Sequence, residues 1–112
     1  MPYIAAHISR ALDAQQKDDL KTALGQAITV IPGKSEKGLM VEIMDSCDLY
    51  FGGEKRDCAY LDVKTYQTAE LSDQKAFCEA VFKIMEQMGF HKKDIYMTIV
   101  GLPNWGVNGT LI

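Results

Sequence analysis

The chain has few of the residues on which disulfide frameworks and metal centres are built. Its 112 residues include 3 cysteines, 3 prolines, 2 histidines and 1 tryptophan. Cys47, Cys58 and Cys78 are odd in number and irregularly spaced, which is typical of neither a disulfide framework nor a zinc site. His7 and His91 lie far apart, without a second ligand at metal-binding spacing. We therefore expect free thiols and no metal.

Long apolar runs and an excess of positive charge are also absent. The 12 lysines and arginines are scattered and are outnumbered by 15 acidic residues, for a net charge of −3, so we expect no nucleic acid partner. No segment is apolar for long enough to span a membrane, and the first residues lack the pattern of a secretory signal. The expected location is the cytoplasm, with leaderless secretion as the alternative.

The first half of the chain has a strand–helix–strand pattern. Residues 3–9 form a short apolar-rich run that predicts a strand. Asp13 is the expected N-cap of a helix, Gln16 completes a capping box, and apolar residues then recur at helical spacing as far as Ile31. A Pro-Gly pair ends this helix, and residues 39–45 predict the second strand.

The second half repeats this pattern. Residues 59–66 predict a strand, Ser72 is the expected N-cap of a helix that runs to Met88, and Gly89 follows as its C-cap. Residues 95–100 predict the last strand. Two β-α-β units joined without a linker predict an α/β fold: a two-layer sandwich of one mixed sheet with both helices on one face.

The chain is expected to be a single domain, 1–112, with pseudo-repeats at about 1–50 and 58–112. Its predicted strands come close to continuous apolar runs, so we expect the second face of the sheet to be apolar and to be buried by cyclic assembly. The tail, 103–112, is apolar with Asn-Gly turn chemistry. The sequence leaves open whether this tail docks on a neighbouring subunit or on its own.

Pro2 follows the initiator methionine directly and opens the first predicted strand. Removal of Met1 would leave Pro2 with a free secondary amine. Burial beside another cation disfavours the protonated form of such an amine, which makes it a base near neutral pH. Met-Pro alone is a weak signal, however, and an ordinary strand-edge proline is the alternative interpretation.

Six short motifs occur in order along the whole chain: Met1-Pro2, Gly33-Lys34, Phe51-Gly52-Gly53, Cys58-Ala59, Ile95-Tyr96 and Asn104-Trp105-Gly106-x-Asn108-Gly109-Thr110. No single motif is specific, but six of them in this order on a repeated β-α-β background are hard to assemble by chance. Together they resemble the macrophage migration inhibitory factor family of the tautomerase superfamily.

The resemblance implies a homotrimer with pockets at its subunit interfaces, each built around a processed N-terminal proline. It implies a cofactor-independent keto–enol tautomerase that acts on phenylpyruvate-like α-keto acids. Pro2 matches the catalytic base that moves a proton between the α-carbon and the enol oxygen. Lys34 matches the lysine that binds the substrate carboxylate and disfavours protonation of the proline.

Four further positions match the substrate-binding part of the family pocket. Tyr66 would offer a backbone N–H and an apolar side chain, and Tyr96 would reach in from the adjacent subunit. Thr98 stands where vertebrate members often carry an asparagine that binds a substrate hydroxyl, and Val107 stands at the rim. From the residues alone, Lys34 is also typical of a solvated lysine after a helix stop, and Tyr96 of a half-buried strand residue.

The chain departs from the family at several positions. Cys58 lacks the second cysteine of the vertebrate Cys-x-x-Cys motif, so thiol–disulfide exchange is not expected. Gly38 replaces a rim aromatic, and Val107 and Leu111 stand where larger rim side chains are common, which predicts a reshaped pocket mouth. The alternative function is a cytokine-like or host-mimicking protein that binds a receptor and has only vestigial tautomerase activity.

Overall fold

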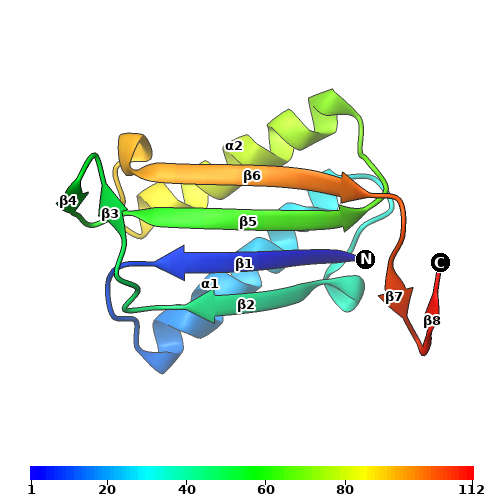
Figure 1. Cartoon of the computed structure of the whole chain (residues 1–112), viewed down its shortest axis with the longest axis horizontal. Helices are drawn as coiled ribbons and strands as arrows, with labels where there is room; N and C mark the ends of the chain where they lie inside the picture. The colour runs from blue at the N-terminus through cyan, green and yellow to red at the C-terminus, as the bar shows by residue number, and fades with distance from the viewer.

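The computed structural model describes all residues, 1–112, in two layers (Figure 1). The first layer is a sheet of four strands: β1 (Pro2–Ile8), β2 (Met40–Met44), β5 (Ala59–Tyr66) and β6 (Ile95–Leu102). Their order is β2-β1-β5-β6, with β1–β2 and β5–β6 parallel and the central β1–β5 pair antiparallel. The predicted mixed sheet of two β-α-β repeats is confirmed.

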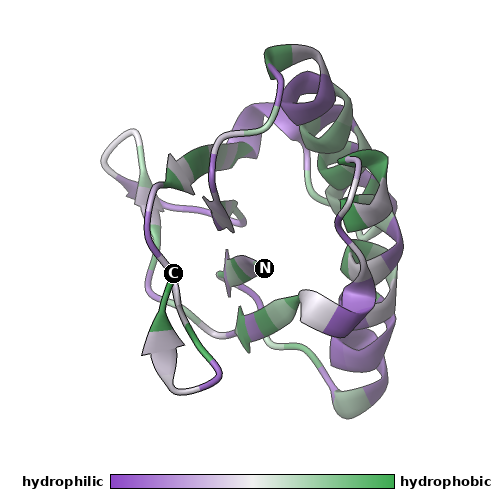
Figure 2. Cartoon of the chain, turned by 90° about the vertical axis from the view of Figure 1, so that its right-hand side faces the viewer, coloured by the Kyte–Doolittle hydropathy of each residue, from purple (hydrophilic) through white to green (hydrophobic).

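The second layer consists of two helices, α1 (Ala14–Ala27) and α2 (Leu71–Gln87), which lie together on one face of the sheet (Figure 2). Neither is both long and apolar enough to traverse a membrane. The short elements are the 3-10 turns η1 (Ile28–Val30), η2 (Glu36–Gly38) and η3 (Lys92–Asp94), and two hairpins, β3 (Tyr50–Phe51) with β4 (Glu54–Lys55) and β7 (Gly106–Val107) with β8 (Thr110–Leu111).

The helix boundaries agree with the sequence at one end of each helix and differ at the other. The capping box is confirmed: the Gln16 N–H donates to Asp13 Oδ1 at 2.8 Å and the Asp13 N–H donates to Gln16 Oε1 at 2.9 Å. The α-helix stops at Ala27, however, and the chain continues to Val30 as the η1 turn rather than as a regular helix to the predicted end.

For α2 the predicted N-cap is wrong. Ser72 lies inside the helix, and the N-cap position is Glu70, whose side chain makes no capping bond. The predicted glycine stop is confirmed: Gly89 takes a left-handed conformation, its N–H donates to the Glu86 carbonyl, and the Phe90 N–H donates to the Met85 carbonyl. These two bonds satisfy carbonyls that the helix end leaves free.

The hydrophobic core lies between the sheet and the two helices. Alternate residues of β1 and β5 point toward the helices, which present apolar side chains in return. Fully buried core side chains are Ile4, Ile8, Leu20, Leu24, Ile28, Leu61, Val63, Phe77, Val81 and Met85. The period of two in the strands and the helical period of α1 and α2 place these residues on facing surfaces.

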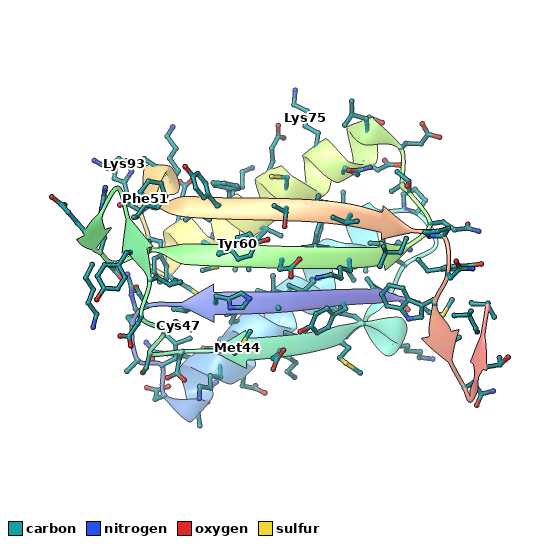
Figure 3. All side chains as sticks on the ribbon, viewed as in Figure 1. Met44, Cys47, Phe51, Tyr60, Lys75 and Lys93 are labelled. Carbon is teal, nitrogen blue, oxygen red and sulfur yellow. The ribbon has the colours of Figure 1, made fainter.

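The opposite face of the sheet is mixed: polar side chains lie there beside the apolar Met40, Met44 and Val100, so the prediction of an apolar second face is confirmed only in part (Figure 3). The Tyr3 hydroxyl donates to Glu42 at 2.5 Å, and the Lys64 ammonium donates to Asp62 at 2.7 Å. The face also carries Tyr60, which stacks on the His7 ring. The physical reason is that successive side chains of a strand point to opposite faces of the sheet. The predicted apolar runs contain a tyrosine, histidine, glutamate or threonine at alternate positions, so these side chains all project to one face.

The tail forms a hairpin that leaves the sheet at the end of β6 and lies on the side away from the helices (Figure 2). Its strands pair around an Asn108-Gly109 turn in which both residues have positive φ, as predicted from the Asn-Gly dipeptide. Leu111 keeps 69% of its surface exposed. The apolar edge of this hairpin is therefore not covered by the same chain.

Candidate active site

Pro2 lies at the end of the sheet where β1 begins, opposite Thr65 of β5. A proline has no N–H to donate to the sheet, and the first position of a strand tolerates this loss. Pro2 is fully buried, and the Tyr66 N–H donates to the carbonyl oxygen of Met1 at 3.1 Å. The first peptide bond of the chain is thus held in a fixed position between two strands.

A hollow of about 620 Å³ opens beside Pro2. We call it the N-terminal hollow. It is bounded by the start of β1, the η2 turn, the end of β6 and the β7–β8 hairpin, and its volume is typical of a small-molecule site. Its lining residues are Met1, Pro2, Tyr3, Lys37, Gly38, Met40, Lys64, Leu102, Trp105, Gly106 and Val107.

The electrostatic character of the N-terminal hollow is cationic. Lys37 and Lys64 line it, and no aspartate or glutamate does. Partial burial, and secondly the nearby charge of Lys34, lower the pKa of the Met1 amine below that of an ordinary α-amine. The structure therefore places Lys34 close to the N-terminus, where its charge acts on any amine at this position.

Val107 and Tyr66 also lie at this end of the sheet. Val107 lines the N-terminal hollow from β7, beside the half-buried Trp105 of the same hairpin. Tyr66 ends β5, and its backbone N–H is occupied by the Met1 carbonyl. The structure thus brings four of the predicted site residues together at one end of the sheet: Pro2, Lys34, Tyr66 and Val107.

Tyr96 lies at the other end of the sheet. It is opposite Tyr60, which is opposite His7, so it lies about five residues, or roughly 17 Å, from Pro2 along the strands. Its side chain is 64% exposed and packs against Phe51, with ring centroids 4.9 Å apart.

These rings form part of a second hollow, the aromatic cavity, of about 210 Å³. Its lining residues are Leu49, Tyr50, Phe51, Gly52, Cys58, Ala59, Tyr60 and Tyr96.

Thr98 is likewise remote from Pro2 within one chain. It lies on the open face of β6, and its hydroxyl is 2.6 Å from the Tyr60 hydroxyl. Tyr96 and Thr98 therefore do not join the N-terminal hollow of their own chain. For Tyr96, the family resemblance implies such a separation, because this residue would be supplied by an adjacent subunit.

Sequence reasoning missed both lysines that line the N-terminal hollow, Lys37 and Lys64, as well as Tyr3, Met40 and Leu102. The signal for Lys64 was present, since it stands two residues before Tyr66 on the same strand and must share its face. Lys37 lies in the η2 turn, and neither helical nor strand periodicity assigns a direction to a side chain there.

The three cysteines are free, as predicted. Burial is the main cause that raises the pKa of the Cys58 thiol, with the nearby Asp94 carboxylate as a smaller cause. A raised pKa leaves little thiolate near neutral pH, and thiolate is the reactive form. Cys58 therefore serves as a packed residue beside the aromatic cavity.

Comparison with known structures identifies the fold. The chain resembles Leishmania major MIF2, with 26% identity and a TM-score of 0.90 over 100% of this chain and 97% of that chain. It also resembles a macrophage migration inhibitory factor-like protein from Entamoeba histolytica, with 18% identity and a TM-score of 0.87 over 99% and 98% of the two chains.

A fused 4-OT, described as an asymmetric trimer, shares the fold at 14% identity, with a TM-score of 0.84 over 96% of this chain and 94% of that chain. A comparison with curated proteins gives no significant match.

The architecture and the proline at the sheet end define a tautomerase-like α/β protein. The family model described as Macrophage migration inhibitory factor (MIF) matches residues 1–112. The chain belongs to the macrophage migration inhibitory factor family, and this fold supports a tautomerase-type or MIF-like function.

Proposed function

We propose that this protein is a keto–enol tautomerase of phenylpyruvate-like α-keto acids that needs no cofactor, with Pro2 as general base. The observation that carries the proposal is the position of Pro2: it is buried at the side of a cationic hollow whose lining contains no carboxylate. A base needs a depressed amine pKa, and an enolate needs nearby cations. The N-terminal hollow supplies both the surroundings that lower an amine pKa and the cations that stabilise an enolate.

The chemistry requires that Met1 be removed. While Met1 is attached, the Pro2 nitrogen is a tertiary amide without a basic lone pair. After removal it is a secondary amine, and the two causes that lower the pKa of the Met1 amine, burial and the charge of Lys34, act on it in turn. We infer that these causes also lower the pKa of the Pro2 amine, which favours its free base.

Removal of Met1 also changes the hydrogen bonding at the site. The Tyr66 N–H loses the Met1 carbonyl as its acceptor and becomes a free donor beside Pro2. Such a preorganised donor can bind a substrate oxygen. Lys34 is the group that we assign to the substrate carboxylate.

The reaction step is a proton transfer. The Pro2 nitrogen takes a proton from the carbon next to the keto group, and the electron pair of the broken C–H bond forms the C=C bond while negative charge develops on the carbonyl oxygen. The protonated Pro2 then returns a proton to that oxygen, and the enol results. Lys34 and the Tyr66 N–H stabilise the developing charge because they are in place before the proton moves.

A complete site, on this proposal, requires more than one copy of the chain. Tyr96 lies at the far end of the sheet and is exposed, and Thr98 lies in the middle of the edge strand β6, opposite Asp62. A neighbouring copy could bring them to Pro2, and we propose the homotrimer implied by the family resemblance. The fused 4-OT with the same fold is described as a trimer, which supports this assembly.

The test is enol–keto conversion of phenylpyruvate, followed by absorbance, with preparations whose N-terminus is defined by mass spectrometry. We expect turnover with processed protein and a loss of at least a hundredfold in Pro2→Ala, which is typical for removal of a general base. Protein with Met1 fully retained should be equally inactive. Equal rates for the processed and the Met1-retaining forms would show that Pro2 is not the base.

A further inference from the structure

We propose that the N-terminal hollow selects α-keto acids that carry a second acidic group, and that Lys37 recognises this group at the mouth of the site. The inference rests on the proposed tautomerase function and names the substrate class of that site. It predicts aryl-pyruvates with a carboxylate on the ring as better substrates than phenylpyruvate itself.

The first argument is the charge of the hollow. Acidic residues outnumber basic ones in the chain, 15 to 12. Nevertheless, both charged residues that line the hollow are lysines, Lys37 and Lys64, and Lys34 lies close enough to act on the N-terminal amine. A hollow lined by cations and by no carboxylate, in a protein of net negative charge, favours anionic ligands to the extent that these cations are unpaired.

The second argument concerns which of these cations is free. Lys64 is already paired: its ammonium lies 2.7 Å from Asp62 Oδ2 and 6.0 Å from the Tyr3 ring centroid. Lys37 forms no ion pair in the chain, and neither does Lys34. If Lys34 holds the carboxylate of the keto acid, Lys37 remains as a second free cation. A substrate with a single carboxylate offers no partner to Lys37.

The third argument is space beside Lys37. Gly38 has no side chain, and a Cβ at this position would lie 3.8 Å from the Met1 nitrogen. In the processed protein Met1 is absent as well, so the missing side chain of Gly38 leaves space between the η2 turn and Pro2. A longer ligand can extend from Pro2 toward Lys37 through this opening.

The apolar lining of the N-terminal hollow suits a ligand with an unsaturated or aromatic core. Trp105 and Val107 of the hairpin, Leu102 of β6 and Met40 of β2 line the hollow with apolar side chains. An apolar wall with a few charged groups at fixed places is the usual composition of a small-molecule site. A ring that carries a second acidic group combines an apolar part for these walls with a charge for Lys37.

The kinetic experiment compares phenylpyruvate with 4-carboxyphenylpyruvate, which differ in one carboxylate. In processed wild-type protein, kcat/KM should be about fivefold higher for the diacid, as expected for one partly exposed ion pair. Lys37→Gln should lower kcat/KM for the diacid about fivefold more than for phenylpyruvate and so remove the preference, and Lys37→Arg should retain it. The preference should also shrink in high salt.

The matched control is Lys75→Gln, because Lys75 is an exposed lysine on α2 and projects away from the sheet (Figure 3). It should leave both substrates unaffected. Turnover of phenylpyruvate with no preference for the diacid, or an equal loss for both substrates in Lys37→Gln, would overturn the assignment of Lys37. Absence of turnover for both substrates would instead contradict the proposed tautomerase function.

A binding experiment tests the substrate class independently of turnover. Trp105 is the only tryptophan and lines the hollow, so its fluorescence reports ligand binding there. Terephthalate, a diacid, should bind about fivefold more tightly than benzoate, and Lys37→Gln should abolish the difference. Equal affinities in the wild-type protein would contradict the inference even if tautomerase activity is found.

Discussion

At the scale of single residues, the site depends on two lysines that do different work. Lys34 acts on the N-terminal amine and is assigned to the carboxylate of the keto acid, whereas Lys37 lines the N-terminal hollow and is assigned to a second acidic group. Both positions are cationic, but only the first is expected to alter the basicity of Pro2. Experiments on substrate charge and on pH separate these roles.

Lys34→Ala should raise KM strongly for phenylpyruvate and much less for its methyl ester, because only the acid presents a charge to the ammonium. An expected tenfold rise for the acid corresponds to about 1.4 kcal/mol of lost interaction. Steady-state kinetics with both compounds measures this difference. Equal losses for acid and ester would assign Lys34 to structure or to the tuning of Pro2.

The pH dependence of kcat/KM reports the pKa of Pro2. Since the free amine is the base, the rate should rise with pH through this pKa and level off above it. Burial and the charge of Lys34 lower the pKa of the N-terminal amine, so the inflection should lie below the ~8 of an ordinary α-amine. Lys34→Gln removes one of the two causes and should move the inflection upward. An inflection above 8 in the wild-type protein would contradict the proposed role of burial.

At the scale of elements, α1 depends on its first turn. Asp13 and Gln16 exchange two hydrogen bonds and thereby satisfy two N–H groups that the helix start leaves free. Leu20, Leu24 and Ile28 of the following turns are buried against the sheet. The capping box therefore fixes where the buried stripe of this helix begins.

Asp13→Ala should lower the free energy of unfolding by about 1 kcal/mol, measured by urea denaturation. Asp13→Asn should remain close to wild type, because an asparagine side chain also accepts the N–H bond. An equal loss in both variants would show that charge, and not the cap, is responsible. Neither change should alter kcat, since α1 contributes no residue to the N-terminal hollow.

At the scale of the whole molecule, the proposed site is split between the two ends of one sheet. Pro2 begins β1 at one end, and Tyr96 enters β6 at the other. Apolar side chains are exposed on the edge strand β2 and on the β7–β8 hairpin, with Met40 at 68% and Leu111 at 69% exposure. Assembly of several copies would both complete the site and cover these side chains.

The protein should sediment at about three times its chain mass of 12.5 kDa. Mixed assemblies give the sharper test. Pro2→Ala and Tyr96→Ala chains should each be inactive or weak alone, but co-refolded mixtures should regain activity, because some sites then combine an intact Pro2 with an intact Tyr96 from a neighbour. No recovery in a confirmed mixed assembly would place both residues in the site of a single chain, and a monodisperse monomer would contradict the trimer.

The sequence by itself determined the elements and their order. The capping box at Asp13, the glycine after Met88 and the two repeated strand–helix–strand patterns are local signals, and each is confirmed in the structure. The motifs and the family resemblance predicted four site residues that lie at one end of the sheet in the structure: Pro2, Lys34, Tyr66 and Val107. Local signals suffice here because caps, turns and periodicity depend on neighbours in the chain.

Only the tertiary structure decided which side chains share a surface. The apolar runs suggested a second apolar face, but the pairing of the strands also collects four polar side chains there: Tyr3, Glu42, Asp62 and Lys64. Lys37 reaches the N-terminal hollow from a 3-10 turn whose direction no periodicity encodes. These outcomes depend on contacts between residues far apart in the sequence, and such contacts are fixed only when the sheet, the turn and the hairpin come together.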